Sequence, residues 1–312
     1  MKTTIIGAGG VGGFFGGKMI KNGKDVTLVA RGAHYEALKS QGLTVKCVEG
    51  DFHLPDVPVI ATIGAMSDSD LVLIFVKTFH TPEVARQLRQ VIQADTLVIT
   101  FQTGLDNDLQ FQDALAHPFV FPGLAYINSS RTAPGVIEQI SGPCTLTFGA
   151  RDAQDNRRLH EVLQLFRRAQ INANLAADIE QEIWTKLIWI SAFAGLTAIH
   201  RSPIGPILND VQGKHLFHRC LAEAEAIARA QGVHLPKGLD RRLMRKIAFY
   251  KTRGQKTRTS LLLDMENGRL TEVETIHGAL VRRARTAQVE TPTLDLIYSV
   301  IKLHNLTAGR NG

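Results

Sequence analysis

Short apolar runs alternate with helical stretches through the first 175 residues of the chain. Four of these runs are typical of strands in a parallel sheet, and they are Thr3–Ile6, Val26–Ala30, Leu71–Val76 and Leu97–Phe101. Two longer β-rich stretches, Phe119–Ile127 and Val136–Phe148, precede a helix that the pattern predicts over about residues 152–169. The alternation predicts an α/β fold, a doubly wound parallel sheet of the Rossmann type with helices on both faces.

The pattern changes after Asp178, because helical periodicity then dominates to the end of the chain. The first long helix of this part carries Ile183, Leu187, Ile190 and Ala194 at steps of three and four residues, which forms an apolar stripe. We therefore predict two domains: a nucleotide-binding domain over residues 1–175 and an all-α C-terminal domain over residues 176–312.

A glycine-rich turn follows the first strand and opens a helix that reaches about Asn22. The turn reads Gly7-Ala8-Gly9-Gly10-Val11-Gly12 and matches the G-x-G-x-x-G pattern of dinucleotide-binding proteins. Its first glycine permits a tight turn, the second lets the backbone approach a pyrophosphate, and the third lets helix and strand pack closely. A second strand follows at the expected distance, so we predict a dinucleotide site here; the alternative is a glycine turn with only a structural role.

The residue after the second strand selects the nucleotide. Proteins that bind NAD usually place an acidic residue there, to accept a hydrogen bond from the ribose 2′-hydroxyl. This chain has Arg31 instead, a cation that pairs well with a 2′-phosphate. Arg31 therefore favours NADPH/NADP+ as the cofactor, and the alternative is a solvated loop arginine.

Charge adds a preference for anionic ligands. The formal net charge is +7, and the excess lies after residue 174; residues 241–258 alone hold eight basic residues and no acidic one. This stretch is read as a solvated helix face or as a region that attracts a phosphate or carboxylate group. Because aromatic residues do not interleave with the basic ones at stacking spacing, we expect no nucleic-acid partner.

Other features indicate a cytoplasmic protein without a metal. The most apolar long segment, Ile183–Ile199, contains Lys186 and suits a core helix better than a membrane span. The N-terminus lacks the pattern of a signal peptide, and the three widely spaced cysteines are expected to be reduced. The 11 histidines form no metal-binding motif, and the oligomeric state stays open, with a homodimer as one alternative.

Several short segments together resemble the ketopantoate reductase family (2-dehydropantoate 2-reductases) over nearly the whole chain. Besides the glycine-rich turn, they are Phe75-Val76-Lys77-Thr78, Gln102-Thr103-Gly104, Trp184-Thr185-Lys186-Leu187, Leu196-Thr197-Ala198-Ile199, and Thr259-Ser260 followed by Asp264 and Thr271-Glu272. The resemblance implies an NADPH-dependent reduction of a 2-keto acid to a 2-hydroxy acid, a step of pantothenate biosynthesis.

The resemblance also implies roles for individual residues. Lys186 would be the general acid that protonates the carbonyl oxygen, and Glu272 would hydrogen-bond the lysine and the substrate. Ser260 would hold the substrate carboxylate, Lys77 would lie at the nicotinamide end, and Ala125 would line the cofactor path. The setting of Lys186 agrees with this role, because burial in an apolar helix lowers the pKa of an ammonium toward the range useful in catalysis. The alternative is a lysine whose stem packs on the core while its ammonium reaches water.

The chain departs from the family at positions where ketopantoate reductases typically present asparagines that hold substrate and cofactor. These positions are occupied by Thr103, Ile190, Ala194 and Ile204. Each lost hydrogen bond to a buried polar substrate costs about 1–3 kcal/mol. Three functions therefore stay open: a ketopantoate reductase, a reductase of a more apolar keto acid with the same mechanism, and an NADPH-binding sensor without turnover.

Overall fold

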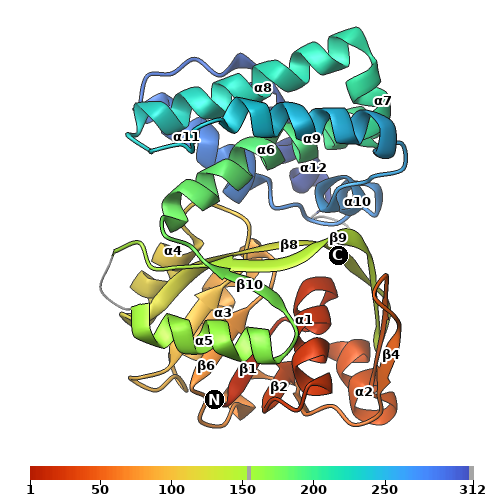
Figure 1. Cartoon of the computed structure of the whole chain (residues 1–312), viewed down its shortest axis with the longest axis vertical. Coiled ribbons are helices and arrows are strands. Elements are labelled where there is room, and N and C mark those ends of the chain that lie inside the picture. Colours follow the sequence, from red (N-terminus) through yellow and green to blue (C-terminus); the bar gives the residue numbers. More distant parts are fainter. Residues whose placement is uncertain (153–155, 309–312) are drawn as a thin grey trace. The chain divides into compact units, whose positions relative to one another are not determined.

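The computed structural model describes residues 1–152 and 156–308, and the chain divides into two compact units (Figure 1). Unit 1 comprises Met1–Gln102 and Asp106–Ile179, and unit 2 comprises Thr103–Leu105 and Glu180–Gly312. Unit 1 is built on a ten-stranded sheet, whereas unit 2 consists of helices in its described part. The predicted fold class, a Rossmann sheet followed by a helical part, is confirmed.

Parallel strands form the centre of the sheet in unit 1. In spatial order they are β5 (Val59–Ile60), β2 (Val26–Val29), β1 (Thr3–Ile6), β6 (Leu71–Ile74), β7 (Leu97–Thr100) and the start of β8 (Val120–Ala133). Every residue of β1, β6 and β7 is buried, which explains why these strands are continuous apolar runs without alternation.

A long hairpin extends the sheet beyond the parallel strands. β8 pairs antiparallel with β9 (Val136–Phe148), and β9 also pairs with β3 (Leu43–Cys47) and β10 (Asn172–Leu175). β4 (Phe52–Leu54) pairs antiparallel with β3 at the end of the sheet. β8 runs six residues past the predicted end at Ile127, because backbone pairing with β9 continues through the polar segment Asn128–Ala133.

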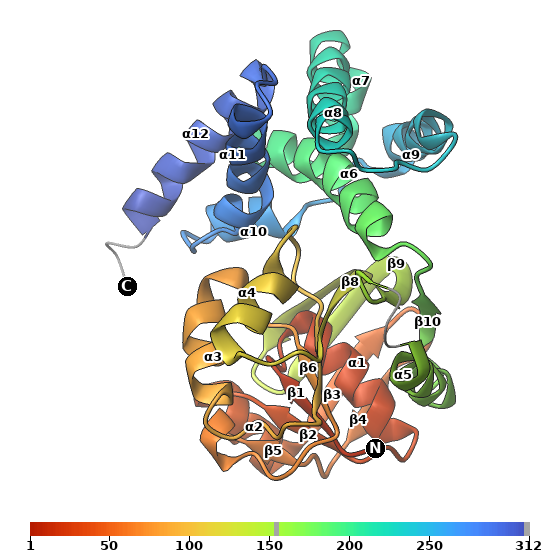
Figure 2. The same cartoon turned by 90° about the vertical axis from the view of Figure 1, so that its left-hand side faces the viewer.

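Helices cover both faces of the sheet (Figure 2). One face packs against α1 (Gly10–Lys21) and α5 (Asn156–Arg168). The hydrophobic core between this face and the helices includes Phe14, Phe15 and Phe166. The other face packs against α3 (Thr81–Leu88) and α4 (Asn107–Leu115), through Val84, Leu88 and Phe111 among others. The remaining helical segments of unit 1 are α2 (Gly32–Gln41) and the 3-10 turns η1 (Ile63–Ala65) and η2 (Thr78–His80).

Unit 2 is organised around the long helix α6 (Ile179–His200). The other helices are α7 (Ile204–Asn209), α8 (Val211–Ala230), α9 (Leu239–Arg253), α10 (Ser260–Glu266), the π-helical turn η3 (Glu274–Gly278), α11 (Ala279–Thr286) and α12 (Pro292–Ala308). Among the described helices, α6 alone is long and apolar enough to cross a membrane, but 72% of its most apolar window is buried, as expected of a core helix.

Candidate functional site

The parallel register gathers several predicted cofactor residues at one edge of the sheet in unit 1. The last residues of β1, β2, β6 and β7 are neighbours in this register. The chain leaves these strands toward Gly7, Arg31, Lys77 and Thr103, respectively. This is the carboxyl edge of the strands, where open α/β sheets bind their ligands.

The glycine-rich turn is shaped by close backbone contacts on one side and is open on the other. Gly7 has a φ of +99°, and a Cβ atom there would lie 2.8 Å from Val76. A Cβ on Gly12 would lie 2.2 Å from the Gly7 carbonyl oxygen, so no side chain fits between β1 and α1. Gly9 differs, because a Cβ there would meet nothing within 4 Å. The open side of the turn is therefore at Gly9.

Gly9 also lies directly before the first residue of helix α1. Gly9 is its N-cap and offers no side-chain hydrogen bond to the first turn. The N–H groups at a helix start lack intrahelical partners, and together with the helix dipole they favour an anion. The open side at Gly9 and the uncapped helix start fit the pyrophosphate of a dinucleotide.

The other residues of the turn contact the protein. Ala8 is 3% exposed, and its N–H donates to the Val29 carbonyl of β2. A Cβ on Gly10 would lie 2.6 Å from the Ser129 carbonyl oxygen, so this glycine lets β8 approach the turn. Val11 is half-buried and packs on the core. These three residues support the turn. The N–H groups of Gly10 and Val11 lie in the first turn of α1, whereas the Ala8 N–H is used by its bond to Val29.

Arg31 is the N-cap residue of α2, and its side chain is about half exposed. Its guanidinium forms a two-point ion pair with the Glu83 carboxylate of α3, with N–O distances of 3.1 and 3.4 Å. The hydrogen bonds from Arg31 lower the pKa of Glu83. Water screens an exposed pair, so Glu83 holds the guanidinium weakly and a bound phosphate could take its place. Glu83 carries no signal in the sequence that links it to the nucleotide, because it lies 52 positions from Arg31.

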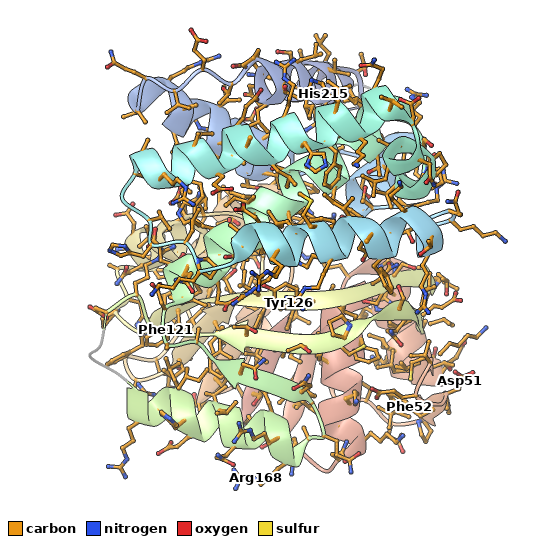
Figure 3. The ribbon with its side chains drawn as sticks, turned by 45° about the horizontal axis from the view of Figure 1, so that its top comes forward. Asp51, Phe52, Phe121, Tyr126, Arg168 and His215 are labelled. Carbon is orange, nitrogen blue, oxygen red and sulfur yellow. The ribbon has the colours of Figure 1, made fainter. Side chains whose placement is uncertain are left out.

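The remaining cofactor candidates lie on β8 and on the segments that follow β6 and β7. Lys77 is half-buried and is the N-cap residue of η2. Ala125 is half-buried on β8, next to Tyr126, which Figure 3 labels. Before Thr103, the buried Gln102 donates from its amide to the Val76 carbonyl at 3.0 Å and so connects the ends of β7 and β6.

In unit 2, Lys186 and Glu272 interact electrostatically, as the resemblance implies. Lys186 lies on α6 and is half-buried, whereas Glu272 lies two residues before the π-helical turn η3. Burial lowers the pKa of Lys186 from 10.5 to about 8, and the nearby Glu272 carboxylate opposes part of that shift. An ammonium with this pKa is protonated at neutral pH and gives up its proton readily, as a general acid must.

Three of the four residues that replace the family's asparagines have apolar side chains. Ile190 and Ala194 are one and two helical turns beyond Lys186 on α6; Ile190 is half-buried and Ala194 is buried. Ile204 is fully buried at the start of α7, where its N–H donates to the Thr257 carbonyl. None of these side chains carries a hydrogen-bonding group.

Ser260 is exposed at the first position of α10, so its hydroxyl is accessible. From the sequence alone, Ser260 is either the cap of this helix or a hydroxyl without a special role, and the structure excludes the first of these alternatives. The cap is Thr259, whose hydroxyl accepts from the Leu262 N–H and shares a 2.8 Å hydrogen bond with Thr197 of α6. Thr259 thereby ties the start of α10 to the helix that carries Lys186.

The basic stretch 241–258 lies mainly on α9. Arg241, Arg242 and Arg245 are exposed, and the Lys246 ammonium lies 5.2 Å from the centre of the Trp189 ring. This arrangement agrees with a solvated helix face. In the described part of the chain, three or more His, Cys, Asp or Glu side chains do not come together as a metal site.

Comparison with known proteins identifies both parts of the chain. The family model described as "Ketopantoate reductase PanE/ApbA" matches residues 3–153, and the model described as its C-terminal part matches residues 178–305. The chain is 28% identical over 307 residues to the "Uncharacterized oxidoreductase YkpB" of Bacillus subtilis, covering 97% of this chain and 99% of that one.

Two solved structures are similar along almost their whole length. A 2-dehydropantoate 2-reductase from Geobacter metallireducens has a TM-score of 0.90 at 26% identity, covering 97% of this chain and 99% of the other. A D-mandelate dehydrogenase, solved with NADH and anilino(oxo)acetate, has a TM-score of 0.88, covering 99% and 100%; at 19% identity it shows a shared fold alone.

Proposed function

Because the chain belongs to the ketopantoate reductase (PanE/ApbA) family, we propose that it is a nicotinamide-dependent reductase of a 2-keto acid. The observation that carries this proposal is the Lys186–Glu272 pair in unit 2, with its half-buried ammonium of pKa about 8. Perturbed pKa values cluster at functional sites, which favours a reaction over binding alone.

The reaction needs one proton at a defined atom. When bound, a nicotinamide would supply the hydride for the keto carbon, and this transfer would leave negative charge on the carbonyl oxygen. Lys186 donates a proton from Nζ to that oxygen, which yields the hydroxyl group. Glu272 stabilises the charged form of Lys186 and so keeps it protonated before the reaction. Ser260, exposed at the start of α10, donates a hydrogen bond to the substrate carboxylate.

NADPH is the proposed cofactor. The turn at Gly9 and the first N–H groups of α1 would hold the pyrophosphate, and Arg31 would pair with the 2′-phosphate in place of Glu83. Lys77 would lie toward the nicotinamide and Ala125 would line the cofactor path, as the family resemblance implies. The NADH in the similar D-mandelate dehydrogenase makes cofactor preference a point to be measured.

For the substrate, we propose a keto acid with an apolar side chain. Ile190 and Ala194 continue the line of Lys186 along α6 without a donor or acceptor for a substrate hydroxyl. A buried hydroxyl without a partner costs about 1–3 kcal/mol. Ketopantoate, the substrate that names the family, is the second candidate.

A matched pair of substrates tests this choice. Trimethylpyruvate has the structure of ketopantoate without the hydroxyl group, so the two compounds differ in that group alone. We expect kcat/KM, followed by NADPH absorbance, to be about tenfold or more higher for trimethylpyruvate. A preference of that size for ketopantoate would instead show that the site recognises the hydroxyl and would place the enzyme in pantothenate biosynthesis.

Other 2-keto acids, among them 2-oxoisocaproate and benzoylformate, complete the panel. Tight NADPH binding without turnover of any of them would contradict the proposed reaction and favour an NADPH sensor. A cytoplasmic location and a homodimer stay predictions, which cell fractionation and sedimentation would test.

A further inference from the structure

A buried histidine connects the glycine-rich turn with the β8–β9 hairpin. His34 lies in the first turn of α2 and is 3% exposed. Its Nε2 atom lies 2.7 Å from the Ala8 carbonyl oxygen, and its Nδ1 atom lies 3.0 Å from the Gly135 nitrogen. Gly135, with a φ of +75°, lies in the turn between β8 and β9.

The two contacts define the form of the ring. The Gly135 N–H can only donate, so Nδ1 must accept and carries no proton. The proton of the neutral ring then lies on Nε2, which donates to the Ala8 carbonyl. Both ring nitrogens are satisfied in this one tautomer, and the neutral form is the one that burial favours, since burial lowers the pKa of His34.

The bond to Ala8 fixes the orientation of the next peptide unit. In a planar trans peptide, the N–H of residue 9 points opposite to the C=O of residue 8. Holding the Ala8 carbonyl toward His34 therefore aims the Gly9 N–H away from the ring. Gly9 is also the position of the turn where a Cβ would meet no atom within 4 Å, so the backbone is open at this residue.

We propose that His34 is a positioning residue for the dinucleotide: its Nε2–H group orients the Ala8–Gly9 peptide, and thereby the N–H groups that receive the pyrophosphate. Its Nδ1 atom anchors the ring to the hairpin turn. This inference rests on the proposed binding of a nicotinamide dinucleotide at the glycine-rich turn.

Two substitutions separate the two hydrogen bonds. In His34→Asn, the side-chain oxygen takes the place of Nδ1 and keeps the Gly135 contact, but the side chain is too short to reach Ala8. In His34→Gln, the terminal amide nitrogen takes the place of Nε2 and keeps the Ala8 contact. His117 offers a matched control, because it is 6% exposed and its Nε2 lies 2.7 Å from the Thr96 carbonyl oxygen.

The readout is the Kd for NADPH, measured by calorimetry well below the melting temperature of each variant. We expect His34→Asn to raise the Kd about tenfold, the equivalent of one net hydrogen bond, and His34→Gln to raise it no more than about threefold. His117→Asn should leave the Kd unchanged. An unchanged Kd in His34→Asn, or equal weakening in all three variants, would overturn the inference.

A second measurement does not depend on the folding of a variant. In the wild-type protein, the 15N resonances of the His34 ring report which nitrogen carries the proton. We expect the Nε2–H tautomer, and the Nδ1–H tautomer or a charged ring at neutral pH would overturn the inference. Wild-type protein that binds no nicotinamide dinucleotide at all would instead contradict the proposed function, which keeps the two failures distinct.

The pH dependence of binding gives an independent readout. Protonation of Nδ1 would place two hydrogen-bond donors, Nδ1–H and the Gly135 N–H, opposite each other. The positive charge of Arg131 on β8 also disfavours a charged ring. NADPH affinity should therefore fall as the pH drops below the ordinary histidine range in the wild type, relative to His34→Gln. The phosphates of the ligand titrate equally in both proteins and therefore cancel in the comparison. A ratio of the wild-type Kd to the His34→Gln Kd that does not change with pH would overturn the inference.

Discussion

At the scale of single residues, Lys186 links sequence and chemistry most directly. An ammonium in the apolar segment that became α6 was expected to have a lowered pKa, and burial lowers the pKa of Lys186 to about 8. The proximity of Glu272 was implied only by the resemblance, because 86 positions separate the two residues in the chain. Their roles in catalysis stay predictions.

The pKa of Lys186 predicts the pH dependence of the reaction. The reductive direction uses the protonated form, so kcat should fall as the pH rises above about 8, whereas the oxidative direction should accelerate over the same range. Because Glu272 raises the pKa of Lys186, the Glu272→Gln variant should move the break to lower pH. Rate profiles in both directions measure this, and a reductive kcat that stays constant above pH 8 would contradict it.

Arg31 and Glu83 predict a pair of opposite effects on cofactor preference. Arg31→Glu should weaken NADPH binding and so narrow the difference between the Kd values for NADPH and NADH. Glu83→Gln should tighten NADPH a few-fold, because it removes a carboxylate that competes for the guanidinium. Kd values for both nucleotides at one fixed, low ionic strength measure the effects. An unchanged preference in Arg31→Glu would remove Arg31 from the phosphate site.

Contacts between distant residues mark the limit of what could be predicted at this scale. The glycine pattern and Arg31 are local signals that a sequence displays. His34 carries no such signal, because its partner Gly135 lies 101 positions away and its burial follows from the packing of α2. Glu83 was missed for the same reason, since the fold alone brings α3 to the end of β2.

At the scale of elements, the apolar pattern predicts the strands that are buried on both faces. β1, β6 and β7 were expected and are observed, each ending within two residues of its predicted end. β10 was missed because its sequence, Asn172-Ala173-Asn174-Leu175, is half polar, and only pairing with β9 makes it a strand. The short strands β3, β4 and β5 also depend on pairing rather than on a distinctive pattern.

The contact between β1 and α1 gives a prediction for two glycines. Gly12→Ala should lower the free energy of unfolding by about 1–3 kcal/mol, because a Cβ would lie 2.2 Å from the Gly7 carbonyl oxygen. Gly9→Ala should change this stability little, since a Cβ there meets nothing within 4 Å, but it should weaken NADPH binding. Urea unfolding and Kd values together measure the contrast. Wild-type affinity in Gly9→Ala would mean that the dinucleotide does not approach this side of the turn.

At the scale of the whole molecule, the change of periodicity after Asp178 predicts the change of architecture from a sheet to helices. The structure divides between Ile179 and Glu180, at the start of α6, and the short segment Thr103–Leu105 groups with unit 2. The order of the parallel strands follows from general rules for alternating strands and helices. The hairpin extension of the sheet does not follow from them, because its outer residues are polar.

In the proposed reaction, Lys186 provides the proton for reduction of a keto acid. The most direct test is a single-turnover experiment, in which enzyme with prebound NADPH is mixed with the best keto acid of the panel. Lys186→Ala is compared with the control Lys246→Ala. Burial also lowers the pKa of Lys246, but its ammonium lies against the Trp189 ring.

We expect Lys186→Ala to slow NADPH oxidation by about 10²–10⁴-fold while the Kd for NADPH stays within about twofold of the wild-type value, and Lys246→Ala to react at the wild-type rate. Oxidation of NADPH by Lys186→Ala at the wild-type rate would show that Lys186 is not the proton donor.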